Sequence, residues 1–176
     1  IFGAFLGYLS SAQQVFQDIY DTGQWFSIYF GVAALAIGVA SVFNSRIVME
    51  LGMRYVTWRA LLATVSVSAA FLLIVFVYAG VPPFWTLMIW LLLTFFCMGL
   101  LFGNLNALAM EPVGHMAGLG AAVSGSVSTF IALPLGWAIG AVLDGTIIPM
   151  VAGFAVLGGM ALLVMWGENR ANFNLP

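Results

Sequence analysis

A chain of 176 residues carries 64% apolar and 15% aromatic side chains, but only 6% of its residues are charged. A soluble domain has about 25% charged residues, so four basic and six acidic side chains cannot cover a soluble surface of this size. Most of the surface is therefore expected to face lipid. A net charge of -2 leaves no basic stripe to neutralise phosphates, which excludes nucleic acid as a partner.

Five apolar runs are long enough to cross a bilayer as helices, each of which needs about 20 residues. They cover approximately residues 25–43, 60–79, 84–103, 117–143 and 147–166. A sixth run, residues 1–20, begins apolar and becomes polar, and the chain opens without a methionine. We interpret this run as a helix whose first part is missing. The sequence predicts an all-α membrane protein with six transmembrane helices, and we expect it to be a fragment of a longer chain.

The charged side chains predict an orientation. If six spans alternate, the predicted loop between the second and third spans, with Arg46, Arg54 and Arg59, lies on the same face as Arg170 in the tail. Three acids fall on the other face: Asp18, Asp21 and Asp144. Arginine is enriched in cytoplasmic segments of membrane proteins. Both ends of the chain are therefore predicted to lie on the cytoplasmic side.

The first predicted helix is polar on one side. Ser10, Ser11, Gln13, Gln14 and Gln17 fall within an arc of about 160° at the α-helical period. Against acyl chains, each unpaired polar group would cost about 1 kcal/mol or more. This face is therefore predicted to line a cavity, although the same pattern is also explained if the polar end lies in the outer membrane interface.

Seven side chains are predicted to lie nearest a substrate. Aromatic and methionine side chains supply contact area without strict directionality, and uncharged polar groups orient a lipophilic ligand. The residues are Phe5, Tyr8, Ser11, Gln13, Gln14, Phe95 and Met98. For Phe95 and Met98, packing in the core or against lipid is the alternative interpretation.

Small residues recur every four positions in the fifth predicted helix. Gly118, Ala122 and Ser126 form one row, and Gly136 and Gly140 form another pair. Such spacing lets helix backbones approach closely, either within the chain or across a dimer. A proline and several hydroxyl side chains in the same helix suggest a bent element that moves against its neighbours, unless the hydroxyls simply bond to their own helix.

The loop after the fourth predicted helix contains Glu111, Pro112, Gly114 and His115. A glutamate and a histidine can share a proton relay. Near the membrane interface, however, capping of helix ends or pairing with Arg46, Arg54 or Arg170 is the preferred interpretation. No two-histidine zinc spacing, paired intramembrane acids or nucleophile with a matching base occurs in the sequence. No enzyme activity, metal or cofactor is predicted.

Two segments resemble the Bcr/CflA drug-resistance transporters of the major facilitator superfamily. They are NLNALAMEPVGHMAGLGAAVSG at residues 104–125 and YLSSAQQVFQDIY at residues 8–20. The motif positions are Glu111, Pro112, Gly114, His115 and Gly118. The resemblance implies that residues 1–176 form the C-terminal six-helix bundle of a twelve-helix transporter. Its spans would correspond to helices seven to twelve, arranged as two inverted three-helix repeats, and the N-terminal bundle would be absent from this chain.

The same resemblance implies proton-coupled efflux of drugs or other small lipophilic molecules across the bacterial inner membrane by alternating access. Partners would be a drug-like substrate, protons, the bilayer and the missing N-terminal half. Helices one, two, four and five would face the substrate cavity between the halves. No acid lies centrally in a predicted span, so the coupling group is expected in the absent half. The alternative is a self-contained six-helix channel or small transporter that acts as a homodimer.

Overall fold

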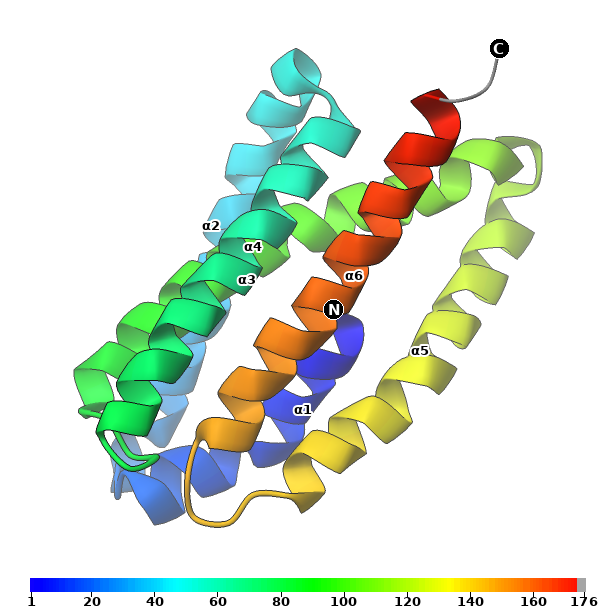
Figure 1. The fold of residues 1–176 in the computed structure, drawn as a ribbon. Coiled ribbons are helices and arrows are strands. Elements are labelled where there is room, and N and C mark those ends of the chain that lie inside the picture. The colour runs from blue at the N-terminus through cyan, green and yellow to red at the C-terminus, as the bar shows by residue number, and fades with distance from the viewer. Residues whose placement is uncertain (174–176) are drawn as a thin grey trace.

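The computed structural model describes residues 1–173, except for the side chains of residues 113–115, 117 and 169–173. The described chain is built of helices and the loops that join them, without a strand (Figure 1), which agrees with the predicted all-α class. Its six α-helices are α1 Phe2–Gln13, α2 Phe26–Leu51, α3 Met53–Val77, α4 Phe84–Met110, α5 Ala117–Ala141 and α6 Ile148–Phe173. Two 3-10 segments, Gly23–Trp25 and Glu111–Met116, join neighbouring helices.

Five helices of the described chain are long and apolar enough to cross a membrane. These candidate spans are Gly23–Leu51, Met53–Val77, Phe84–Met110, Gly118–Ala141 and Ile148–Glu168. The first helix is shorter and continues as a π-helical segment, Gln14–Ile19. The wider turns of this segment are visible in the bond from the Tyr20 N–H to the Val15 carbonyl, at 3.2 Å. The single uniform helix predicted for residues 1–20 therefore changes its winding near residue 14.

The arginine-bearing loop predicted between the second and third helices is absent. Arg46 lies within α2, and Arg54 and Arg59 lie within α3, because both helices continue well beyond their apolar runs. Only Gly52 separates them, with φ 80° and ψ 150°, a conformation that glycine adopts at little steric cost. A helix satisfies its own backbone in water as well as in lipid, so hydropathy marks the membrane boundary and not the helix end.

The packing order relates the first three helices to the last three. The main contacts pair α1 with α5, α2 with α4, and α3 with both α4 and α6, while α1 also touches α6. If each helix of the first half is matched with the helix three places later, α1 corresponds to α4, α2 to α5 and α3 to α6. The α1–α5 contact then corresponds to the α4–α2 contact, and the α3–α6 contact corresponds to itself. The two halves of the chain therefore make corresponding main contacts.

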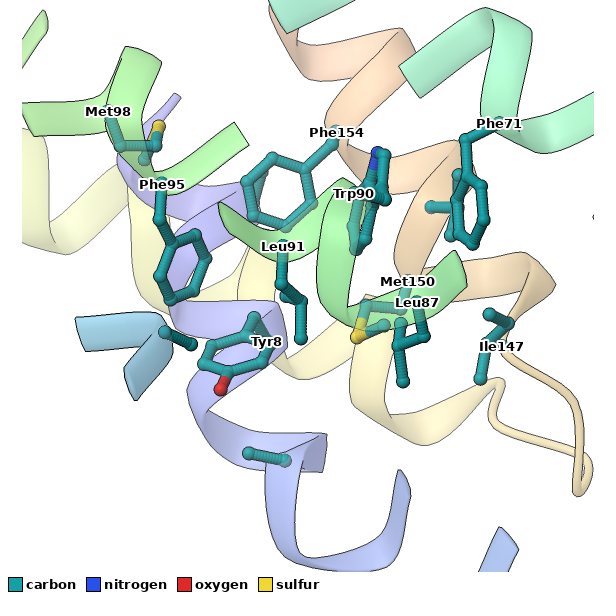
Figure 2. Close-up of a cluster of buried hydrophobic side chains, with 14 of the residues drawn as sticks. Tyr8, Phe71, Leu87, Trp90, Leu91, Phe95, Met98, Ile147, Met150 and Phe154 are labelled. Atoms are coloured by element: carbon teal, nitrogen blue, oxygen red, sulfur yellow. The ribbon is translucent and has the colours of Figure 1, made fainter. Parts of the chain in front are cut away.

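A cluster of buried side chains joins α3, α4 and α6 around Trp90 (Figure 2). The Trp90 ring is stacked on Phe71 with centroids 5.3 Å apart, and meets Phe154 edge-on at 5.4 Å. Its indole nitrogen donates a hydrogen bond of 3.3 Å to the Ser68 hydroxyl. The one polar atom of the largest buried side chain is thus paired, as a core without water requires.

The three loops at the end opposite the arginines are tied together. The Tyr20 hydroxyl donates to the Pro82 carbonyl at 2.8 Å, and the Ile147 N–H donates to the Gly80 carbonyl at 3.0 Å. Gly80 has φ 95°, and a Cβ there would collide with the Thr146 side chain. These bonds connect the α1–α2, α3–α4 and α5–α6 connections, so this end of the described bundle is closed by loop contacts.

Candidate functional site

A hollow of about 630 Å³ lies between α1, α4 and α5 on the arginine-bearing half of the bundle. It forms because α4 and α5 touch little, although they are adjacent in sequence. The connecting 3-10 segment separates the end of α4 from the start of α5, and Figure 1 shows α5 standing apart from α2 and α3. One end of the bundle is therefore tied and the other is hollowed.

The lining of this hollow is mainly apolar with a few uncharged polar groups. The polar groups come from Asn106 of α4 and from Ser124, Ser128 and Thr129 of α5. The Thr129 hydroxyl donates to the Gly125 carbonyl at 2.8 Å, so its hydrogen is used within α5. None of the described lining residues is charged. A hollow of about 300–1,000 Å³ with an apolar wall and few polar groups is typical of small-molecule sites.

A row of aromatic rings leads from the hollow into the core. Phe2 and Phe102, which both line the hollow, meet edge-on at 6.2 Å. Phe5 then contacts Phe102 at 5.4 Å and Phe95 at 5.7 Å, and Phe95 contacts Tyr8 at 4.8 Å. The predicted residues Phe5, Tyr8 and Phe95 are therefore brought together, next to the hollow and not in its wall.

Tyr8 ends this row and carries an unpaired hydroxyl. Its side chain is 1% exposed and stacked on Phe30 of α2 at 6.0 Å. The hydroxyl is buried without a hydrogen-bond partner in the described chain. Figure 2 shows it pointing away from the cluster that contains Leu91 and Phe154. An unpaired buried hydroxyl costs about 1–3 kcal/mol, so within the described residues nothing offsets the burial of this oxygen.

The other predicted substrate residues are placed differently. Ser11 is buried, and its hydroxyl donates to the Gly7 carbonyl of its own helix at 2.6 Å. Met98 is fully buried in the core. Gln13 and Gln14 are exposed on the surface of this chain, and the Gln13 amide reaches the Gln17 side-chain oxygen at 3.4 Å. None of the seven predicted residues lines the hollow itself.

Several lining residues were not among the predicted substrate contacts. The hydroxyls of Ser124, Ser128 and Thr129 were visible in the sequence as a group on one helix, which was a usable signal. Nothing local distinguishes Phe102 from the chain's other phenylalanines. Its position in the wall follows from how α4 approaches α1, which is a property of the packed bundle.

The small residues of α5 divide into two groups. A Cβ at Gly136 would lie 2.7 Å from the Leu6 Cβ, and one at Gly140 would lie 2.9 Å from the Ser10 hydroxyl, so both glycines permit the close approach of α1. Gly118, Ala122 and Ser126 are exposed, and a Cβ at Gly118 would meet nothing within 4 Å. The close helix packing predicted for the row of Gly118, Ala122 and Ser126 is therefore not made within the described chain. The helix continues through Pro134.

The arginine-bearing end is held by a small ionic group. Arg54 lies 2.9 Å from Glu168 of α6 and 3.8 Å from Glu111 at the end of α4. The predicted pairing of Glu111 with an arginine is therefore confirmed, and Glu168 is a partner that the sequence did not reveal. Pro112, Arg46 and Arg59 are exposed. The side chain of His115, the surroundings of Gly114 and the side chain of Arg170 lie outside the described part.

Asp144 lies in the loop between α5 and α6, outside the candidate spans. Asp144 accepts hydrogen bonds from the Thr146 hydroxyl at 2.7 Å and from the Thr146 N–H at 3.2 Å. The hydroxyl bond lowers the pKa of Asp144 below its ordinary value. Within the described residues, no group of three His, Cys, Asp or Glu side chains is placed to hold a metal ion.

No family model matches the sequence, and no solved structure matches the fold. The chain is 31% identical over 174 residues to "Uncharacterized MFS-type transporter YdgK" of Bacillus subtilis (strain 168). The similarity covers 97% of this chain and 42% of that protein. It supports a relation to MFS-type transporters. The chain thus spans less than half of that protein's length, and the relation agrees with the apolar helices in placing the chain in a membrane.

Proposed function

We propose that this chain forms part of an alternating-access transporter for small molecules, with the hollow between α1, α4 and α5 as its share of the transport pathway. The observation that carries the proposal is the contrast between the two ends of the bundle. Three loops are bonded to one another at one end, while a hollow of about 630 Å³ opens at the other. An element closed on one side and open on the other is what alternating access requires.

We infer that the chain supplies the C-terminal half of a twelve-helix protein, as helices seven to twelve. The repeat-like correspondence of the α1–α5 and α4–α2 pairs supports this assignment. The chain also spans only 42% of the length of the transporter that it resembles. The exposed row of Gly118, Ala122 and Ser126 would then pack against helices of the N-terminal half, because small residues suit close helix contacts.

The proposed substrates are small lipophilic molecules such as drugs. The aromatic wall supplies contact area without strict directionality, and Ser124, Ser128 and Asn106 supply hydrogen bonds. Phe5, Tyr8, Phe95 and Met98 would form the deeper part of the site, with Ser11 behind them. Gln13 and Gln14 would face the partner half, since both are exposed on this chain. An uncharged wall fits a substrate range that does not depend on one ionic group.

We propose outward transport driven by protons across the bacterial inner membrane, with both chain ends cytoplasmic. The described acids all lie at or near helix ends, namely Asp18, Asp21, Glu50, Glu111, Asp144 and Glu168. A proton-coupled carrier needs a titratable group at depth. In this proposal that group belongs to the N-terminal half.

The experiment uses the complete native polypeptide in everted membrane vesicles with a fluorescent lipophilic dye. We expect dye accumulation that requires a proton gradient and collapses with a protonophore. Ser128→Trp, which fills the hollow, should abolish accumulation. Val164→Trp places the same ring on a side chain of α6 that is 73% exposed, and should leave it intact. Flux that ignores the gradient would instead favour the homodimeric channel, and equal loss in both variants would refute the assignment of the pathway.

A further inference from the structure

A second hollow, about 560 Å³, lies on a different side of the bundle, between α2 and α3. Both helices pack against α4, but they touch each other little although only Gly52 separates them. The space between them is therefore a groove whose floor is α4, formed by Phe96, Cys97 and Leu100. Its walls are formed by Ile47, Leu51, Tyr55, Val56, Arg59, Ala60, Leu62, Ala63 and Ser66.

The groove is apolar along its length and basic at one end. Arg59 is the one charged residue of its described lining, and no acid lines it. Arg59 lies six residues inside α3 from Met53, which is about 9 Å at the α-helical rise. From Arg59 to Ser66 the groove continues about 10 Å further towards the middle of the span. Its polarity therefore changes with depth as that of a membrane leaflet does.

Arg59 is held at the rim of the groove. Its guanidinium carbon lies 5.9 Å from the centroid of the Tyr55 ring, one turn earlier in α3. The ion pairs formed by the described residues use Arg54, which contacts Glu111 and Glu168, and not Arg59. Arg59 is exposed and has no carboxylate against it in the described chain. A guanidinium offers two parallel N–H groups that match a phosphate oxygen pair.

We propose that this groove binds an anionic phospholipid from the leaflet next to the arginine-bearing end. Its phosphate lies on Arg59, and one acyl chain follows the groove past Leu62 and Ala63 to Phe96. The charge complementarity selects an anionic headgroup, and the apolar length selects a lipid over a soluble anion. Basic pockets between membrane helices are known to recognise such headgroups. The site is separate from the proposed transport hollow, with which it shares no lining residue.

The test uses the complete native polypeptide, purified and delipidated, and titrated with palmitoyl-oleoyl phosphatidylglycerol or phosphatidylcholine under native mass spectrometry. The wild type should bind phosphatidylglycerol more tightly than phosphatidylcholine. Arg59→Gln should weaken that binding about fivefold. It should weaken phosphatidylcholine binding less, because the trimethylammonium group of that lipid offsets the charge of its phosphate. Arg59→Lys, which keeps the charge, should retain most of the preference. Ala63→Trp fills the groove and should weaken both lipids.

Arg54→Gln is the matched control, because it removes an exposed arginine of the same end that does not line the groove. It should change binding less than about twofold. If Arg54→Gln and Arg59→Gln weaken phosphatidylglycerol binding equally, the preference comes from the general positive charge of this end and not from the groove. That result would overturn the proposal. So would an unchanged affinity in Ala63→Trp at an unchanged melting temperature. If free glycerol phosphate displaces the lipid, the site recognises a soluble anion and not a phospholipid. That result would also overturn the proposal.

Discussion

Asn44 of α2 and Asn104 of α4 bind each other through two hydrogen bonds. The Asn44 amide nitrogen donates to the Asn104 oxygen at 3.1 Å, and the Asn104 nitrogen donates back at 2.9 Å. Asn104 is 3% exposed. The pair forms a closed ring between two helices that also approach closely at Gly99, where a Cβ would collide with the Ile37 carbonyl. The α2–α4 contact is thus fixed by one polar link and one close backbone approach.

This pair predicts a specific double-mutant cycle. Asn44→Leu leaves the buried Asn104 amide without its partner, and Asn104→Leu leaves the half-buried Asn44 amide without its own. We expect each to lower the free energy of unfolding by about 1–2 kcal/mol, and the first by more. Replacing both removes the stranded group, so the double variant should be more stable than the sum of the single losses predicts. Unfolding of the detergent-purified protein measures the three values. Strict additivity would show that the two amides do not interact.

The unpaired hydroxyl of Tyr8 predicts a split between stability and transport. Tyr8→Phe removes a buried polar atom that has no partner in the described chain, so the melting temperature should not fall. If the hydroxyl binds substrate, transport of hydrogen-bonding substrates should decrease several-fold while binding of purely apolar dyes is retained. Phe30→Leu, which disturbs the ring stacked on Tyr8, is the packing control. Unchanged transport of every substrate by Tyr8→Phe would remove the hydroxyl from the site.

The α1–α5 contact predicts that Gly136 tolerates no side chain. Gly136→Ala places a Cβ 2.7 Å from the Leu6 Cβ and 3.0 Å from the Gly7 nitrogen, which are not the flexible ends of side chains. Overpacking of this kind costs about 1–3 kcal/mol. Gly159→Ala is the control, because a Cβ there meets nothing within 4 Å. Thermal unfolding should show a loss for the first variant and no loss for the second. Equal melting temperatures would mean that α1 and α5 are further apart.

The ionic group at the arginine-bearing end predicts small, salt-dependent effects. The side chains of Arg54, Glu111 and Glu168 are each about half exposed, and exposed pairs contribute about 0.2–1 kcal/mol. Glu168→Gln should lower stability more than Glu111→Gln, because its oxygen is 2.9 Å from Arg54 and that of Glu111 is 3.8 Å away. Melting temperatures at low and high salt check this order. A loss that persists in high salt would point to packing instead.

Asp144 predicts a pH effect of definite sign. The Thr146 hydroxyl bond lowers its pKa in the folded state, so ionised Asp144 stabilises the fold. That contribution is present above the ordinary pKa of about 3.9 and is lost as the pH falls through the lowered folded-state value. The melting temperature of Asp144→Asn should be below that of the wild type at pH 6, and the two should converge below pH 4. Thr146→Val, which removes the bond, should show the same convergence. A constant difference would contradict this.

The sequence predicted the spans well because burial in lipid requires about 20 apolar residues in a row. It did not predict where helices end outside the membrane, and α2 therefore continues past Arg46 to Leu51. Residue type made Phe5, Tyr8 and Phe95 candidate substrate contacts, and the fold brings these three side chains together. Their contact with Phe30 and Phe102 depends on which faces of apolar helices meet, and helices that are apolar all round carry little record of that choice.

The six helices are proposed to be one half of a transporter. The direct test is the intact mass of the native polypeptide, taken from its own membrane with an antibody against residues 168–176. We predict a mass more than twice the 18.8 kDa of this chain, because the chain spans 42% of the transporter that it resembles. A mass near 18.8 kDa would contradict the account and make a homodimer of six-helix chains the better explanation.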